Sequence, residues 1–415
     1  MRTRIPDRLR AFALGRRCSL VLAAGVLALG GAGSEVAAVP SALAASEAPA
    51  ATVGTLASLP YSFPTGSGGS LTRPLGISVF QGNVYVSNSA DNLVSDLNGG
   101  STTTVAGNLE GSGESGDGGP ATLSTLWQPT GTAEDSAGDI YIADTEDNTV
   151  RKIDAATGVI TRFAGNGQGG STGPGDEGSR DRGDRATQVR LDAPQGVAVN
   201  QAGDVFIADT NNNRVDEVLP DGHIVGFAGN GKAGYAGDGD KATRAELTEP
   251  IGLAVDSAGN VYIADAGNNL VRRVDAKTGI ISTVAGDYAA DQANGGLGGF
   301  SGDDGPATSA QLYSPQGVAI DGAGDLFIAD TFNNAIREVT PGGTISTVVN
   351  AAGTNGATPP SGGETNGPAT ASKLSGPSAV AIDSSTNTLY IADTHNSKAA
   401  AVTGLAQSGS APSGV

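Results

Sequence analysis

The chain has 415 residues, a formal net charge of −19, 64 glycines and only 4% aromatic residues. Such a negative charge repels phosphate backbones and anionic lipid surfaces, which argues against nucleic acid as a partner. The glycine content favours tight turns between short strands over long helices.

Residues 1–44 are predicted to be a signal peptide. Six arginines and the apolar run CSLVLAAGVLALGGAG precede the A-x-A cleavage signal Ala42-Leu43-Ala44. Cleavage removes Cys18, the only cysteine, and changes the formal net charge to −23. The mature chain then has no disulfide, no zinc–thiolate site and no membrane span. We expect a secreted, extracellular protein, with cell-wall association as a variant and an uncleaved signal anchor as the alternative.

From Pro74 onward one pattern occurs six times. Each copy begins with an apolar run, continues with a run of the YIAD type and, in copies one to five, ends with two further β-branched runs; the first runs start at Pro74, Pro129, Pro194, Pro250, Pro315 and Pro377. Turn signals rich in Gly, Asp and Pro separate the runs. Four short antiparallel strands per copy predict an all-β fold, a six-bladed β-propeller of four-stranded blades.

The sixth copy lacks a fourth run, and the N-terminus offers a replacement. Thr52-Val53-Gly54-Thr55-Leu56-Ala57 resembles the fourth run of the other copies. We expect this N-terminal strand to complete blade six and close the ring, which protects an otherwise exposed edge. The propeller is therefore predicted over residues 45–403, as a monomer, with a flexible tail at 404–415.

The consensus PxGhAVDxxGxhYIADTxNNxhRxV resembles the NHL repeat family of β-propellers, over residues from about 52 to 403. The resemblance implies a six-bladed ring with a central channel. It implies no single activity, because the family includes ligand-binding and protein-binding domains and related propellers include lyases. An amidating lyase of this kind needs several histidines around zinc, and this chain has only His223 and His395.

Five copies share the element Ala-Thr-x-x-x-Leu-x-x-Pro just before the first run, as in Ala121-Thr122 to Pro129. We expect a helical turn there, with Thr as its cap and Leu as a plug beneath the loop. Four positions before the Ala stand Asp117, Asp238 and Asp303, replaced by Arg182 and Thr365 in the other two copies. We expect these three aspartates to accept hydrogen bonds from amides of the glycine turns, and we expect no cofactor; a calcium or magnesium site at these aspartates is the alternative.

The acid that ends the YIAD run also recurs, and its repetition indicates a structural role. A catalytic site is built once, whereas this residue appears as Asp144, Asp209, Asp265, Asp330 and Asp393, with Asn88 in the first copy. Asn follows four positions later in most copies, and Arg151, Arg272 and Arg337 stand seven positions later in three of them. We expect Asp to accept from turn amides, Asn to adopt a positive φ, and Arg to pair with a neighbouring acid.

Residue variation on this repeated frame predicts a recognition surface. In a meander the turns after the YIAD runs and the long inserts between blades share one face, called here the insert face. Variable side chains on this face are the binding candidates: Trp127, Glu146, Asn211, Tyr313, Phe332 and His395. For Trp127 and Tyr313, capping the core between blades is the alternative.

The sequence thus predicts a non-catalytic module that binds a protein or a small-molecule ligand on the insert face or at the channel mouth. The alternative is a propeller lyase or hydrolase with a divalent metal held by acids of the channel. In that alternative His395 is a candidate general base, and no other catalytic residue is assigned. A purely structural cell-surface component is the third hypothesis.

Overall fold

The computed structural model describes residues 52–58, 71–97, 102–109, 111–170, 184–350 and 366–405, with the backbone alone at 52–58 and 366–368. The chain divides into Met1–Ser46 and Glu47–Val415, and every described residue belongs to the second unit. The predicted signal peptide therefore lies outside the described residues.

The described chain is almost entirely β-strand, and its strands form six antiparallel sheets. Blade 1 contains β2 (Pro74–Phe80), β3 (Asn83–Asn88), β4 (Leu93–Asp96) and β5 (Thr103–Ala106). Blade 2 contains β6 (Pro129–Glu134), β7 (Ile140–Asp144), β8 (Thr149–Ile153) and β9 (Ile160–Ala164). Blade 3 contains β11 (Pro194–Val199), β12 (Val205–Asp209), β13 (Arg214–Val218), β14 (His223–Ala228) and the short outer β10 (Asp184–Arg185).

The other three blades repeat this arrangement. Blade 4 contains β15 (Pro250–Val255), β16 (Val261–Asp265), β17 (Leu270–Val274) and β18 (Ile281–Ala285). Blade 5 contains β20 (Pro315–Ile320), β21 (Leu326–Asp330), β22 (Ala335–Val339), β23 (Thr344–Val349) and the short outer β19 (Gly305–Pro306). Blade 6 contains β25 (Pro377–Asp383), β26 (Thr388–Asp393), β27 (Lys398–Thr403), β1 (Thr52–Ser58) and the short outer β24 (Asn366–Pro368).

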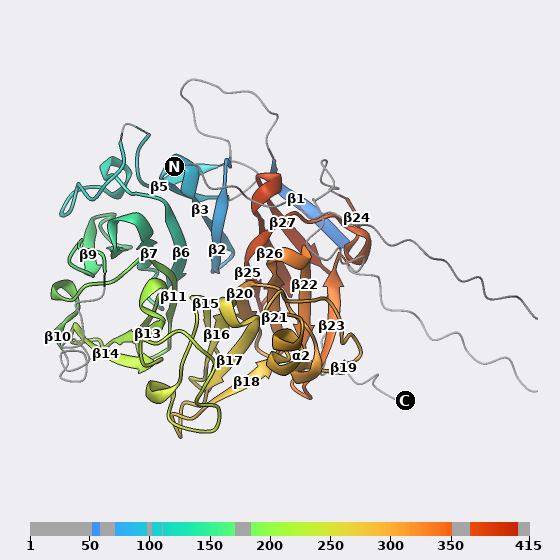
Figure 1. The fold of residues 1–415 in the computed structure, drawn as a ribbon. Helices are drawn as coiled ribbons and strands as arrows, with labels where there is room; N and C mark the ends of the chain where they lie inside the picture. The colour runs from blue at the N-terminus through green and yellow to red at the C-terminus, as the bar shows by residue number, and fades with distance from the viewer. Residues whose placement is uncertain are drawn as a thin grey trace, which may run out of the picture. The chain divides into compact units, whose positions relative to one another are not determined.

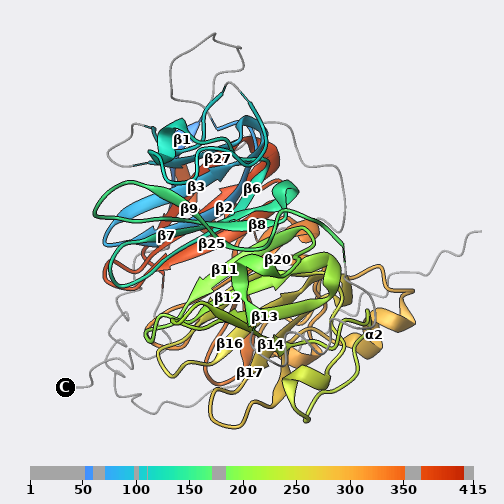
Figure 2. The same ribbon diagram turned by 90° about the vertical axis from the view of Figure 1, so that its left-hand side faces the viewer.

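Short helices occupy two fixed places in the repeat. A 3₁₀ turn follows the second strand of every blade: η1 (Ser89–Asp91), η4 (Thr145–Asp147), η7 (Thr210–Asn212), η9 (Ala266–Asn268), η11 (Thr331–Asn333) and η13 (Thr394–Asn396). Another lies in each insert: η3 (Ala121–Leu123), η6 (Ala186–Gln188), η8 (Ala242–Arg244), η10 (Ala307–Ser309) and η12 (Ala369–Ala371). The α-helix of the described residues, α2 (Tyr288–Ala293), belongs to the insert between β18 and β19 and lies outside the strands (Figure 2). No helix in the described ranges is both long and apolar enough to span a bilayer.

The six sheets close into a ring, as predicted. The innermost strands β2, β6, β11, β15, β20 and β25 contact one another in this order, and β25 contacts β2. Figure 1 shows these strands around the centre, with the later strands of each blade further out. The closing strand β1 pairs with β27 in antiparallel register, from Thr52 opposite Thr403 to Ser58 opposite Lys398. The predictions of a six-bladed propeller and of its N-terminal closing strand are therefore confirmed.

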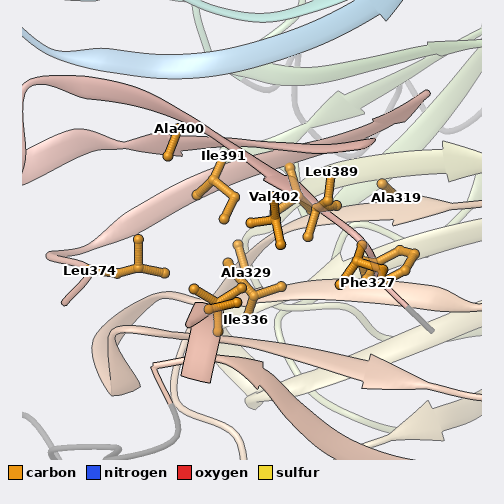
Figure 3. Close-up of a cluster of buried hydrophobic side chains, with 13 residues drawn as sticks. Ala319, Phe327, Ala329, Ile336, Leu374, Leu389, Ile391, Ala400 and Val402 are labelled. Carbon is orange, nitrogen blue, oxygen red and sulfur yellow. The ribbon is translucent and has the colours of Figure 1, made fainter. Parts of the chain in front are cut away.

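The hydrophobic core is divided among the six seams between blades. Each of six clusters of buried side chains joins two consecutive blades. In the seam between blades 5 and 6, Phe327 and Ile336 face Leu389 and Ile391 (Figure 3). One blade cannot bury both of its faces alone, so the stability of each sheet depends on its neighbours.

The Ala-Thr-x-x-x-Leu element forms a 3₁₀ turn, and the predicted threonine cap is wrong. No side-chain cap hydrogen bond is present at η3, η6, η8 or η10, and the threonines, such as Thr122, are exposed. The alanine is buried instead, and its carbonyl accepts from the residue after the preceding strand, which is a glycine in four copies, as in Gly107 N to Ala121 O at 3.1 Å, and Asn350 in the fifth. The leucine lies buried beneath the loop in all five copies, as expected: Leu126, Leu191, Leu247, Leu312 and Leu374.

The packed chain continues slightly beyond the predicted boundary at residue 403. Leu405, which the prediction assigned to the tail, is buried in the cluster between blades 5 and 6. Its carbonyl accepts a hydrogen bond from Asn387 Nδ2 at 2.8 Å. The rest of the predicted tail, 406–415, lies outside the described residues.

Candidate recognition face

The channel at the centre of the ring holds a narrow cavity of about 80 Å³. Its lining comes from the first residues of all six inner strands and consists of Leu, Ile, Val, Gly, Ala, Thr, Ser and Gln side chains. No acid, base or histidine is among these described lining residues. The metal-dependent alternative required channel acids. One acid on an inner strand, Glu134 at the end of β6, accepts from Ser78 Oγ at 2.6 Å; Ser78 Oγ in turn lies 2.8 Å from Oγ1 of the lining residue Thr132.

The glycines of the Pro-x-Gly motif allow the inner strands to approach at the channel. A Cβ at Gly76, Gly131, Gly196 or Gly252 would lie closer than 3.0 Å to a backbone carbonyl oxygen of the next blade. Blade 6 carries Ala379 at the corresponding position. The motif therefore reflects ring closure and not a ligand contact.

Each recurring YIAD aspartate is buried and holds the end of its own insert. Asp144 Oδ1 accepts from Trp127 N at 2.6 Å, and Asp330 Oδ1 accepts from Tyr313 N at 2.8 Å. Asp209, Asp265 and Asp393 accept in the same way from Asp192, Thr248 and Ser375, and Asn88 from Thr72. Burial raises the pKa values of Asp265, Asp330 and Asp393 to about 6. The YIAD aspartates therefore position the residue that follows each insert leucine, and Trp127 and Tyr313 are two of these residues.

The three insert aspartates considered for calcium or magnesium bind buried arginines. Arg151 Nη2 lies 2.6 Å from Asp117, Arg337 Nη2 lies 2.7 Å from Asp303, and Arg272 pairs with Asp238 in the same way. All three arginine side chains are fully buried, and each also faces the YIAD aspartate of its blade. The described residues contain no group of three His, Cys, Asp or Glu side chains placed to hold a metal ion.

Chelation is therefore expected to leave the thermal stability of the chain unchanged. Each insert aspartate already has a cationic partner, so a divalent ion would have to displace an arginine. The measurement is the melting temperature of the full chain with EDTA and with added calcium or magnesium, because an ion that binds the folded state raises it. A melting temperature that falls in EDTA and recovers with one of these ions would contradict this assignment.

The asparagines that follow the 3₁₀ turns connect each blade to the next. Five of them adopt positive φ values between 52° and 57°: Asn92, Asn148, Asn213, Asn269 and Asn334. Their side-chain oxygens accept from the residue that precedes the first strand of the next blade, as in Asn148 Oδ1 from Ala193 N at 2.9 Å. The insert face therefore has a regular backbone frame fixed by local side chains.

On this frame, the residue after the insert leucine and the second residue after the YIAD aspartate meet as a pair in blades 2, 3, 5 and 6. Backbone hydrogen bonds join Glu146 N to Trp127 O at 3.1 Å, Asn211 N to Asp192 O at 3.1 Å, Phe332 N to Tyr313 O at 3.1 Å and His395 N to Ser375 O at 3.0 Å. We call these four the recognition pairs. Their side chains differ in size and charge while their backbone connection is the same.

The aromatic members of the recognition pairs differ in exposure. Trp127 is 42% exposed and Phe332 is 43% exposed. Tyr313 is half-buried, with its ring centroid 5.0 Å from that of Phe332 in an edge-to-face contact. Glu146, Asn211 and His395 are exposed. All six predicted binding candidates thus lie on the insert face, in blades 2, 3, 5 and 6.

Sequence reasoning missed several residues of this face. Leu123 in η3 and Leu297 after α2 are 70% and 64% exposed. Glu114 binds both Arg162 Nε and Nη2 at 2.5 Å beside blade 2. The leucines were detectable as large apolar residues within glycine-rich inserts. The Glu114 contact spans 48 residues and left no local signal.

Comparison with known proteins finds matches to propellers of one family. The Teneurin NHL domain family matches residues 229–295 and 290–403, and the NHL repeat family matches residues 191–215. NHL repeat-containing protein 2 of Bos taurus is 28% identical over 279 residues, 62% of this chain and 36% of its own length. Teneurin-4 of Mus musculus is 33% identical over 235 residues, 54% of this chain and 8% of its own. The chain thus spans well under half of these relatives.

Solved structures of low sequence identity share the fold. An auxiliary nutrient binding protein from Bacteroides thetaiotaomicron aligns with a TM-score of 0.58 and 14% identity, over 85% of this chain and 76% of that one. A gluconolactonase from Xanthomonas campestris aligns with a TM-score of 0.51 and 13% identity, over 85% and 89%. These structures show the fold alone, and the family models add that residues 191–215 match the NHL repeat and residues 229–403 match the Teneurin NHL domain, so the closed ring of six blades is a β-propeller with NHL-type repeats.

Proposed function

We propose that this propeller is an exported, non-catalytic binding module that recognises a protein or small-molecule ligand through the recognition pairs of its insert face. The observation that carries the proposal is the combination of one repeated backbone frame with non-repeated, exposed side chains. Trp127 and Phe332 offer aromatic area, while Glu146 and Asn211 offer polar groups. Large aromatic side chains surrounded by polar ones are typical of recognition surfaces.

The charge of the chain narrows the class of ligand. A formal net charge of −23 after removal of residues 1–44 disfavours anionic ligands, so we expect a neutral or cationic one. The fold does not decide between binding and catalysis, because proteins of similar structure include a nutrient binding protein and a gluconolactonase. The described residues that line the channel cavity carry no titratable group, which favours binding over chemistry inside that cavity.

The test compares face variants with a variant of the opposite face. Trp127→Ala and Phe332→Ala are expected to reduce retention of extracellular proteins or metabolites by the immobilised chain at least tenfold, while each lowers the free energy of unfolding by about 1 kcal/mol. Gln201→Ala, in the exposed turn between β11 and β12, is the control and is expected to retain what the wild type retains. Mass spectrometry of the eluate and urea denaturation are the two measurements.

Two results would contradict the proposal. One is a ligand retained equally by Trp127→Ala, Phe332→Ala and the wild type, because binding would then lie elsewhere. The other is conversion of a retained metabolite into a product, because the chain would then be an enzyme.

A further inference from the structure

One position of the repeat differs in blade 2. In blades 3 to 6 an asparagine three residues after the YIAD aspartate donates its Nδ2 to that carboxylate, at distances of 2.7 to 2.9 Å: Asn212, Asn268, Asn333 and Asn396. Blade 1 has the two residue types exchanged, and Asn88 Nδ2 donates to Asp91 Oδ2 at 2.7 Å. Five blades thus pair one carboxylate with one amide. Blade 2 places two carboxyl groups there, Asp144 and Asp147.

The hydrogen-bond positions around this pair require a proton. Asp144 is fully buried, and its Oδ1 already accepts from Trp127 N at 2.6 Å. Asp147 Oδ2 is a buried atom with no hydrogen-bond partner among the described residues. An ionised carboxylate can only accept, so Asp147 can replace the amide donor of the other blades only when it carries a proton.

The neighbouring charges do not neutralise a second negative charge at the pair. Glu114 of the insert acts on the pair, as do Arg151 from β8 and Arg162 from β9. Asp117 of the insert contacts Arg151, and Glu146 belongs to the same 3₁₀ turn as Asp147. Arg162 is bound by Glu114, and Arg151 is shared between Asp117 at 2.6 Å and Asp144 at 3.5 Å. Both arginines are therefore already paired with acids of the insert.

Burial, and secondarily the charge of Glu114, raises the pKa of Asp147 to about 6. Burial also raises the pKa of Asp144 well above its usual value, and Asp147 adds to this effect. Because a raised pKa means that the folded state binds the proton more tightly than the unfolded state, protonation stabilises the fold fully at any pH below the pKa of the unfolded chain. This stabilisation is lost as the pH rises through about 6.

We propose that Asp144 and Asp147 share one proton in the folded protein, and that release of this proton makes the blade 2 recognition pair, Trp127 and Glu146, responsive to pH. Two hydrogen bonds connect the carboxyl pair to the recognition pair. Asp144 Oδ1 bonds to Trp127 N, and Trp127 O in turn bonds to Glu146 N, the residue adjacent to Asp147. Proton sharing rests on the place of Asp147 at the amide position of the other blades and on its buried Oδ2, whereas its relevance for a ligand rests on the proposed function.

Trp127 is the only tryptophan of the chain, so its fluorescence reports on this pair directly. In the full-length wild type under native conditions, we expect the emission to change between about pH 5 and pH 8 with a midpoint near 6. Asp147→Asn restores the arrangement of the other blades and is expected to abolish the transition. Glu146→Gln removes the nearest exposed acid and is expected to keep it. An unchanged transition in Asp147→Asn, or its loss in Glu146→Gln, would overturn the proposal.

Urea denaturation gives an independent readout. The midpoint of Asp147→Asn is expected to exceed that of the wild type at about pH 8, with the difference vanishing toward pH 5. Asn333→Asp is the reciprocal variant in blade 5, where Arg337 and Asp303 match Arg151 and Asp117. It is expected to add a new loss of stability over the same pH range. Parallel pH profiles for the wild type and both variants would overturn the proposal. Neither readout uses a ligand, so failure of the proposed function would leave this test intact.

Discussion

Gly196→Ala is expected to lower the free energy of unfolding by about 3 kcal/mol or to prevent folding. A Cβ at Gly196 would lie closer than 3.0 Å to the carbonyl oxygen of Ile251 on the next inner strand. Both atoms belong to backbone held in its own sheet, so neither can rotate away. Relief requires the separation of blades 3 and 4, which would open the cluster of buried side chains between them.

Urea denaturation of the full chain measures this effect, and Gly226→Ala is the matched control. Gly226 lies in β14 of the same blade, and a Cβ there would meet nothing within 4 Å. We expect this control to unfold within about 1 kcal/mol of the wild type. A Gly196→Ala protein as stable as Gly226→Ala would show that the inner strands are not in close contact at the channel.

Arg337→Met is expected to lower the free energy of unfolding by about 3 kcal/mol, because it removes one partner of a buried ion pair. The side chains of Arg337 and Asp330 are both fully buried, 3.3 Å apart. Arg337 also donates to Ser301 O at 3.1 Å and lies over the ring of Phe300. Methionine fills part of the volume but leaves Asp330 without its cation.

The matched comparison is Arg273→Met in the third strand of blade 4. Arg273 is 32% exposed and lies 3.4 Å from Asp275, which is also partly exposed. Such a pair is screened by solvent, so we expect Arg273→Met to lower the free energy of unfolding by less than about 1 kcal/mol. Equal losses for the two variants, measured by urea denaturation, would mean that burial of Arg337 does not decide its contribution.

The sequence was sufficient for the architecture, because each signal is repeated six times. The runs that begin at Pro74, Pro129 and their equivalents all form the innermost strands. The closing role of residues 52–57 could be inferred because the sixth copy lacked one run. The short strands β10, β19 and β24 were not predicted, since their pairing depends on the path of the inserts. The prediction that Thr122 caps its turn was wrong, because the turn is a 3₁₀ turn in which Thr122 is exposed.

The candidate site was less accessible from sequence. Both variable series could be assigned to the insert face, but not their pairing, because Trp127 and Glu146 meet only through the fold of the insert. The partner of Asp117 is Arg151, 34 residues away, so the sequence around Asp117 alone is equally compatible with a metal loop. A difference between the copies does indicate that the insert aspartate pairs with the strand arginine. The third copy has Arg182, outside the described residues, at the insert position and Asp216 at the strand position, the reverse of Asp117 and Arg151.

The pairing of β1 with β27 has a consequence for the order of folding. Thr52 lies opposite Thr403, so the strand near the start of the chain is completed only by a strand near its end. A ribosome releases the first strand long before its partner exists, and contacts of such sequence separation form slowly. During synthesis the nascent chain must therefore carry an unpaired β1, and the last blade remains an open sheet edge until the whole repeat array has emerged.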